Sequence, residues 1–187
     1  MLELAALGLL YGQPMHGYRL KQQLERFMGG CITVNFGAIY PLLKRLECQG
    51  AVSVREEGGE TGSNRKIYSL TDYGKKLWHQ YMLEHPQESW VNSRSRFMIK
   101  FFFFGHLEPQ ERVKLLRHRL MLTTLHLDNK ESVYPECTDA HQTEVFSYIS
   151  SILRNEIVWL QAQLLKEEAL LDEVPSSLTS SLLGHKP

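Results

Sequence analysis

The sequence predicts a mainly α-helical protein that contains one small β-hairpin. Apolar residues recur at spacings of three and four over most of the chain, which is the period of helices with one buried face. Only residues 51–57 and 65–70 alternate between apolar and polar side chains, and the Gly-rich residues 58–64 separate them, as in a long hairpin. Residues 84–92 interrupt the helical period with Pro86 and several polar residues, so we expect two parts joined there.

The composition is that of an ordinary globular protein. The chain has 187 residues, of which 43% are apolar, and this excludes a largely disordered protein. Lys+Arg and Asp+Glu both number 21, so no net charge indicates nucleic acid or a membrane. Residues 1–80 hold ten Lys/Arg and seven Asp/Glu, which allows a basic surface on the first part.

The cysteines and the apolar segments indicate where the protein works. Cys31, Cys48 and Cys137 are far apart and odd in number, which fits reduced thiols better than disulfides. The opening residues lack the basic segment of a secretory signal, and no apolar run is long enough to cross a bilayer. We expect a cytoplasmic protein without a membrane partner. A redox-sensing role for Cys31 or Cys48 is a minor alternative.

The first two helices are expected over residues 2–12 and 14–28. The first has an apolar stripe at helical spacing that includes Ala5, Ala6 and Leu9. Gly12 and Pro14 then end this helix and start the next, because Pro suits a first helical turn. Gly17 in the second helix is expected to allow a close approach of the third.

A third helix is expected after Asn35. Its apolar face is formed by Ile39, Leu42, Leu43 and Leu46, while Tyr40, Lys44 and Glu47 form an outward row. Pro41 costs a hydrogen bond inside a helix, so we expect this helix to be kinked or to start late.

The hairpin follows the third helix, and Thr71 is expected to cap a fourth helix. Three helices followed by a two-stranded hairpin is the order of a winged helix-turn-helix. We therefore predict a winged helix-turn-helix DNA-binding domain over residues 1–84.

The second part is expected to be entirely helical. Helices are predicted for Ser93–Gly105, from Pro109 onward, and for a long segment from about Asp139 to Asp172. The apolar stripe of the last helix is too wide for one short neighbour to cover, so it needs a partner. We predict a helical dimerisation and regulatory domain over residues 93–174, with a flexible tail at 175–187.

Three sequence strings in the first part resemble the PadR family of bacterial transcriptional regulators. They are MHGY at residues 15–18, GAIYPLLKRLE at 37–47 and NRKIYSLT at 64–71, followed by Gly74. This resemblance covers residues 2–80. The string FMIKFFFFGHL at 97–107 is similar to the C-terminal domain of the subgroup that includes virulence activators.

The resemblance implies a homodimeric winged-helix protein that binds double-stranded DNA. Its third helix would enter the major groove, the hairpin would lie along the backbone or minor groove, and the C-terminal helices would pair the subunits. Two-fold symmetry then implies an inverted-repeat operator. Repression is favoured over activation, under the control of a small molecule or stress signal whose identity is unknown.

Several side chains of the winged domain are candidates for contact with DNA. Tyr40 and Lys44 lie one helical turn apart, so both could reach the phosphates of one strand. Arg45 lies at the edge of that face and could read a guanine. His16 could donate to a phosphate or be exposed and idle. The alternative for the third helix is a solvated surface with Tyr40 partly packed.

The hairpin contributes the remaining candidates. Its basic residues Arg55, Arg65 and Lys66 are expected to form one cluster that grips phosphate or the minor groove. Asn64 could donate to the DNA backbone or only satisfy the turn. The nearby acidic residues would repel phosphate; they are Glu56, Glu57 and Glu60. The predicted DNA-binding residues are His16, Tyr40, Lys44, Arg45, Asn64, Arg65 and Lys66.

Other functions find little support in the sequence. No catalytic, nucleotide-binding or zinc-binding spacing is present, so we expect no enzyme, cofactor or metal. The Phe101–Phe104 run favours core or dimer packing over an effector pocket shared with Trp90, Phe97 and Met98. A rival interpretation is a winged-helix module that contacts only proteins, which the acidic hairpin residues and the neutral net charge support.

Overall fold

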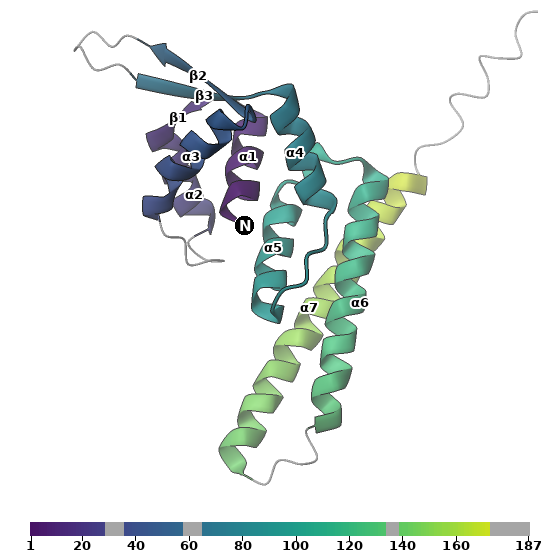
Figure 1. Ribbon diagram of the computed structural model, residues 1–187. Helices are drawn as coiled ribbons and strands as arrows, with labels where there is room; N and C mark the ends of the chain where they lie inside the picture. The colour runs from purple at the N-terminus through teal and green to yellow at the C-terminus, as the bar shows by residue number, and fades with distance from the viewer. Residues whose placement is uncertain (29–35, 58–64, 134–138, 173–187) are drawn as a thin grey trace, which may run out of the picture. The chain divides into compact units, whose positions relative to one another are not determined.

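A computed structural model describes residues 1–28, 36–57, 65–133 and 139–172 of the chain (Figure 1). The chain divides into two compact units, Met1–Gly105 and His106–Pro187. Helices make up most of the described residues, and they are joined by one small antiparallel sheet. The predicted fold class is therefore confirmed.

The first unit is a winged helix followed by one further helix. Its elements are α1 (Leu2–Gly12), β1 (Met15–His16), α2 (Gly17–Met28), α3 (Ile39–Cys48), β2 (Val52–Glu57), β3 (Arg65–Leu70), α4 (Asp72–Leu83) and α5 (Trp90–Phe102). The strands form an antiparallel sheet in the order β1-β3-β2. Figure 1 shows β2 and β3 extending together as the wing beside α1, α2 and α3.

Apolar side chains from all of the first four helices form the core of this unit. The largest that are fully buried are Leu4, Leu7, Leu20, Leu24, Ile39, Leu43, Leu46, Trp78 and Met82. The apolar face predicted for the third helix is entirely buried. This core fixes the orientation of α3, whose opposite face is exposed.

The second and third helices both begin later than their apolar periodicity alone would place them. The second helix was expected from residue 14, but it begins at Gly17 because Met15 and His16 pair with Tyr68 and Ile67 in the sheet. The third helix starts late, as expected, since a short 3₁₀ turn over Phe36–Ala38 precedes it. Pro41 then lies in the first turn of α3, where its missing N–H leaves no helical hydrogen bond unmade.

Thr71 joins the wing to α4. Its hydroxyl accepts a hydrogen bond from the Gly74 amide (3.0 Å), which confirms the predicted cap. Its own amide donates to the carbonyl oxygen of Ala51 at 3.1 Å, next to the first residue of β2. The first turn of α4 is therefore fastened to the base of the wing.

Helix α5 belongs to the first compact unit because its C-terminal end packs on α1 and α4. The Phe103 ring is buried and lies edge-on to the Trp78 ring, with a centroid separation of 6.3 Å. An added Cβ at Gly8 of α1 would lie only 2.6 Å from the same Phe103 ring. The unit boundary after Gly105 thus lies further along the chain than the junction expected near residues 84–92.

The Phe101–Phe104 run contributes mainly to packing. Phe103 and Phe104 are buried, and Phe102 is exposed. Phe101 is half-buried, and its ring is tilted against the Phe104 ring with a centroid separation of 4.8 Å. The helix itself begins at Trp90, three residues before the expected Ser93, with Ser89 as its cap.

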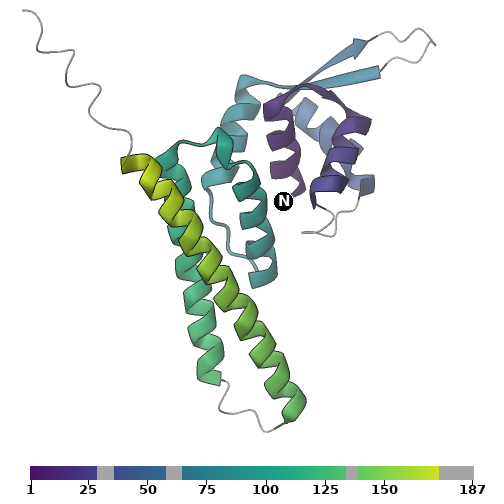
Figure 2. The ribbon, with the colours of Figure 1, turned by 180° about the vertical axis from the view of Figure 1, so that it is seen from behind.

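The second unit is a helical hairpin of α6 (Pro109–Val133) and α7 (Ala140–Asp172). The two helices lie side by side in both Figure 1 and Figure 2. Leu116, Leu153 and Leu160 are buried in this unit. Arg119 and Glu156 form a buried ion pair between the helices at 2.7 Å. The predicted tail at 175–187 lies outside the described residues.

Candidate nucleic-acid interface

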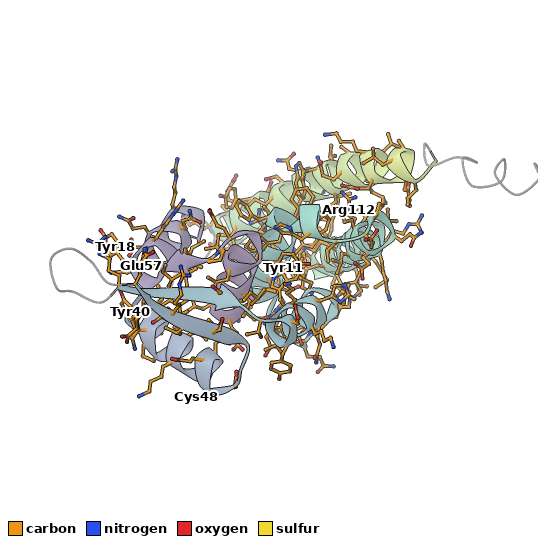
Figure 3. All side chains as sticks on the ribbon, turned by 90° about the horizontal axis from the view of Figure 1, so that it is seen from above. Tyr11, Tyr18, Tyr40, Cys48, Glu57 and Arg112 are labelled. Atoms are coloured by element: carbon orange, nitrogen blue, oxygen red, sulfur yellow. The ribbon has the colours of Figure 1, made fainter. Side chains whose placement is uncertain are left out.

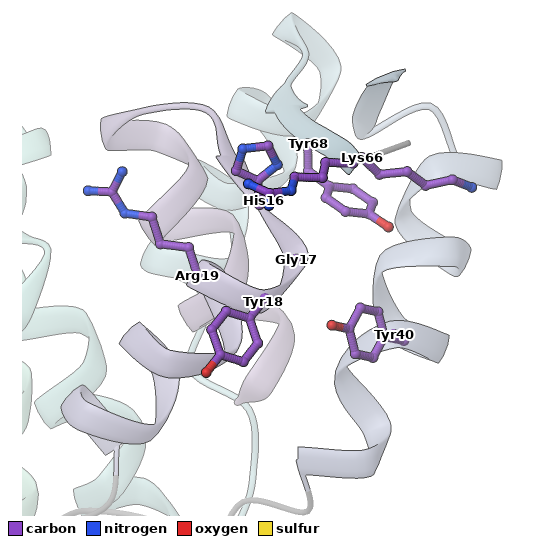
Figure 4. A pocket seen from close by; sticks show the side chains of 8 residues that line it. His16, Gly17, Tyr18, Arg19, Tyr40, Lys66 and Tyr68 are labelled. Carbon is purple, nitrogen blue, oxygen red and sulfur yellow. The ribbon is translucent and has the colours of Figure 1, made fainter. Parts of the chain in front are cut away.

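A hollow of about 690 Å³ opens on the winged unit where the first turns of α2 and α3 meet strand β3. Its lining combines aromatic and basic side chains: His16, Gly17, Tyr18, Arg19, Tyr40, Arg65, Lys66 and Tyr68. Figure 4 shows Tyr18 and Tyr40 on facing sides, with His16 and Lys66 along the edge formed by the strands. Four of the eight residues were predicted from the sequence as DNA contacts: His16, Tyr40, Arg65 and Lys66.

The start of α2 gives the hollow a fixed positive character. Gly17, Tyr18 and Arg19 form the first turn of this helix, and all three line the hollow. The first amides of a helix have no partner within it, and the helix dipole is positive at this end. A phosphate is therefore a suitable ligand for this turn.

Gly17 allows the walls of the hollow to come close together. A Cβ built at this position would lie 3.1 Å from the Tyr40 ring and 3.2 Å from the Tyr68 ring. These distances are shorter than ordinary carbon–carbon contacts. The close approach that the sequence predicted for Gly17 is present, and it positions the two rings.

The three tyrosines of the hollow differ in exposure. Tyr40 and Tyr18 are 52% and 63% exposed, and the Tyr18 hydroxyl accepts a hydrogen bond from Gln22. Tyr68 is buried, and this burial, together with the nearby Glu47 carboxylate and Tyr40, raises the pKa of its phenol. Tyr40 and Tyr18 therefore present hydroxyls to solvent, while Tyr68 stays protonated against the core.

Three predicted cations are available for a ligand. Lys44 follows Tyr40 by one turn on α3, while Arg65 and Lys66 begin β3, and all three are exposed. Within residues 1–28, 36–57, 65–133 and 139–172, no carboxylate lies at ion-pair distance from any of them. None of the three is held in a described ion pair, although Glu57 and Glu56 lie opposite Arg65 and Lys66 in the strand register.

Strand alternation divides the basic residues of the wing between two faces, although Arg65 and Lys66 both line the hollow at the start of β3. Adjacent residues of a strand point to opposite faces, so Lys66 shares the face of the buried Tyr68, whereas Arg65 lies on the other face. Arg55 pairs with Ile67 and therefore shares the face of Arg65. The wing can accordingly present a cation on each side.

One of the acidic residues of the wing, Glu57, lies close to His16. The Glu57 carboxylate lies 3.8 Å from Nε2 of His16, a distance that allows an ion pair when His16 is protonated. Figure 3 shows Tyr18, Tyr40 and Glu57 at the same end of the unit. Glu60 and Asn64, the other predicted residues of this region, lie outside the described residues.

Arg45 points away from the hollow. Its guanidinium donates to a carboxylate oxygen of Glu3 on α1 at 2.6 Å. Arg45 follows Tyr40 by five residues, so the two lie about 140° apart around α3. The predicted guanine contact would require Arg45 to leave Glu3.

Two details of the hollow could not be predicted from the sequence pattern: that Arg19 lines it, and that the predicted candidate His16 reaches it from a strand. Arg19 lines it, although its spacing shows only that it faces outward. His16 reaches it through the short strand β1, which exists only because β3 pairs with it.

Other kinds of site are not seen in the described residues. No group of three or more His, Cys, Asp or Glu in these ranges is arranged to hold a metal ion. None of the described helices is long and apolar enough to cross a membrane. Cys48 is exposed at the end of α3, and Cys31 and Cys137 lie outside the described ranges.

All the residues that line the hollow belong to a segment of the chain that matches a known protein family. Residues 6–80 match the model of the "Transcriptional regulator PadR-like family". The "Negative transcriptional regulator PadR" of Bacillus subtilis is 28% identical over 147 residues, which cover 79% of this chain and 80% of that protein. "Transcriptional regulator YqjI" of Escherichia coli is 36% identical over 73 residues, which cover 39% of this chain and 33% of that protein.

Solved structures were also compared. The crystal structure of Bacillus subtilis PadR in complex with operator DNA is 26% identical, with a TM-score of 0.45, over 89% of this chain and 98% of that chain. The same protein in complex with p-coumaric acid is 25% identical, with a TM-score of 0.42, over 89% of this chain and 95% of that chain.

Proposed function

Residues 6–80 belong to the PadR-like family of transcriptional regulators, and from this premise we propose that the chain is a sequence-specific DNA-binding repressor. It binds an inverted-repeat operator as a homodimer. It acts in the cytoplasm, without catalysis and without a cofactor. A name given to one similar protein, the negative regulator of Bacillus subtilis, supports repression over activation.

The observation that carries this proposal is the chemistry of the hollow. The first turn of α2, the exposed Tyr40 hydroxyl and the cations Arg19 and Lys66 surround one space that is open to solvent. Helix amides, hydroxyls and basic side chains are the groups that contact DNA phosphates in most complexes. One phosphate of the DNA backbone therefore fits the hollow.

With a phosphate held there, α3 becomes the recognition helix. Lys44 lies one turn beyond Tyr40 on the exposed face of α3, where it can reach a neighbouring phosphate or the major groove. Arg65 and Lys66 both line the hollow where the wing begins, which suits a wing that follows the backbone or enters the minor groove. His16 adds a donor at the edge of the hollow.

The second unit supports the proposed homodimer. Its helices expose large apolar side chains that the hairpin itself does not cover: Met121, Leu125, Val145, Tyr148, Val158, Leu165 and Leu170. Several of them lie one helical turn apart, as Met121 and Leu125 do, and apolar side chains that gather in this way are typical of an interaction site. Pairing of two such hairpins would give two recognition helices related by two-fold symmetry, which matches an inverted repeat.

We further propose that the second unit carries the regulatory signal. Residues 97–107, which lead into this unit, resemble the C-terminal domain of the virulence-activator subgroup. A small molecule or stress signal that alters the packing of the second unit would change the fit to the operator. Such a ligand is expected to lower DNA affinity without separating the subunits.

Fluorescence anisotropy on the DNA upstream of the protein's own gene tests the proposed function. The protein is expected to prefer this duplex over a scrambled one, and Tyr40→Ala/Lys44→Ala is expected to weaken binding at least tenfold. Lys76→Ala removes an exposed cation from α4, outside the hollow, and serves as the matched control that retains affinity.

The rival function makes a different prediction. A winged-helix module that contacts only proteins would bind neither duplex at low salt while remaining dimeric. Absence of binding to the upstream duplex and to a library of random duplexes would therefore refute DNA recognition.

A further inference from the structure

We propose that Glu3 is a positioning residue for the recognition helix and that Arg45 is its anchor on α3, not a DNA-reading side chain. The proposal deepens the proposed function, on which its DNA readouts rest. Its basis is a polar junction of Glu3, Arg45 and Tyr81, which brings together residues from α1, α3 and α4.

Both oxygens of the Glu3 carboxylate have partners from other helices. Arg45 of α3 donates to Oε2 at 2.6 Å, and the Tyr81 hydroxyl of α4 donates to Oε1 at 3.2 Å. The Glu3 side chain is only 21% exposed, whereas that of Arg45 is 57% exposed. The carboxylate is thus the sheltered centre of the junction, and its removal would affect three helices.

Tyr81 acts as a hydrogen-bond donor in this junction. Burial and then the Glu3 carboxylate raise the pKa of the Tyr81 phenol. Its hydroxyl therefore remains a donor, and a carboxylate at position 3 is the complementary acceptor. Glu3 is held by α4 on one side and can hold α3 on the other.

The geometry opposes a role for Arg45 at the DNA. The apolar face of α3 is bound to the core, and Tyr40 and Arg45 lie on opposite flanks of it. To contact a base, Arg45 would have to give up a short charged hydrogen bond and leave Glu3 with only the Tyr81 hydroxyl. Charge-assisted hydrogen bonds of this kind are about twice as strong as neutral ones.

The arrangement therefore assigns separate tasks to the two flanks of α3. The flank with Tyr40 lines the phosphate hollow, and the flank with Arg45 ties α3 to the rest of the unit. Small rotations of α3 move Lys44 relative to DNA, so the tie contributes to sequence preference. The Arg45 charge, already paired, contributes little to the salt dependence of DNA binding.

Three variants separate positioning from DNA contact: Glu3→Gln, Arg45→Ala and the double variant. Glu3→Gln keeps the shape of the side chain and removes its charge. Asp72→Asn is the matched control, because the described ion pair of Asp72 is with Lys75 of the same helix and not with α3. Each protein is titrated with the upstream and the scrambled duplex at several salt concentrations.

If Glu3 positions α3, Glu3→Gln should lower the preference for the upstream duplex over the scrambled one by about fivefold or more. Asp72→Asn should leave this preference unchanged. The freed Arg45 should steepen the slope of log K against log[salt] in Glu3→Gln, by up to about 0.9 per subunit. Arg45→Ala alone should leave that slope unchanged, and adding it to Glu3→Gln should remove the steepening. A slope that falls by about 0.9 per subunit in Arg45→Ala would show a phosphate contact and overturn the proposal.

A measurement without DNA keeps this inference separate from the proposed function. Amide hydrogen exchange of α3 in the DNA-free protein should be faster in Glu3→Gln than in the parent, because the tie between α1 and α3 is weakened. Equal exchange rates in α3 would overturn the positioning role even if the parent binds DNA. Faster exchange would support it even if the upstream duplex were not the operator.

Discussion

Gly74 allows the first turn of α4 to pack closely against the base of the wing, and its replacement by Ala should strongly destabilise the winged unit. A Cβ built at this position would lie 2.0 Å from the carbonyl oxygen of Ala51 and 2.7 Å from a methyl carbon of Leu70. The first of these atoms belongs to the backbone, which cannot turn aside as a flexible side chain can. The first turn of α4 must therefore move by about 1 Å or more to reach ordinary contact distances.

The loss in the free energy of unfolding can be estimated from these contacts. Overpacking of a tight site costs roughly 1–3 kcal/mol. Movement of α4 would also weaken the Thr71–Ala51 and Gly74–Thr71 hydrogen bonds, at about 0.5–1.5 kcal/mol each. Ala gains up to about 1 kcal/mol over Gly in a helix, which offsets part of this. The net expectation is a loss of about 2–4 kcal/mol in the free energy of unfolding.

Urea denaturation followed by circular dichroism measures this loss. Gly12→Ala is the matched control, because a Cβ at Gly12 of α1 meets nothing within 4 Å. That variant should stay within about 1 kcal/mol of the parent protein. If Gly74→Ala unfolds at the same urea concentration as Gly12→Ala, the close packing of α4 on the base of the wing is refuted.

Three further perturbations have expected outcomes. Lys44→Ala should reduce the slope of log K against log[salt] by about 0.9 per subunit, and an unchanged slope in DNA titrations would exclude a phosphate contact there. Burial, with Arg96 nearby, lowers the pKa of Lys100 from 10.5 to about 8. Between these values the unfolded chain holds more protons, so the free energy of unfolding should rise with pH, by at most about 3 kcal/mol. Lys100→Met should lack this rise in denaturation curves at pH 8 and 10. Arg119→Met strands the buried Glu156 carboxylate and should cost about 3–5 kcal/mol in urea denaturation. Arg119→Met/Glu156→Leu should recover most of that loss, and a double variant as unstable as the single would contradict the pairing.

Local patterns in the sequence predicted most of the helices and both strands of the wing. The face of α3 formed by Ile39 and Leu43 follows the helical period, and the alternation in residues 65–70 follows the strand period. Strand β1 was missed because two residues carry no period and pair only with the distant β3. The position of α5 depends on Phe103 meeting Trp78 and Gly8, which is tertiary packing that no local pattern encodes.

The same distinction applies to the candidate site. Tyr40 and Lys44 were predicted because they share an outward row on one helix, and Lys66 because it is one of the basic residues of the wing. The partner of Arg45 could not be predicted, since Glu3 lies 42 residues earlier in the chain. The alternation of Arg65 and Lys66 follows from the strand period, but their meeting with Tyr18 and Tyr40 in one hollow depends on tertiary packing.

Hydrogen exchange of the full chain with and without the upstream duplex tests the proposed DNA interface most directly. Protection is expected in the first turns of α2 and α3 and in β3, the elements that form the hollow, with Tyr40 and Lys66 among the protected positions. Bound DNA that protects only α5, α6 or α7, while leaving α2, α3 and β3 unchanged, would contradict the account.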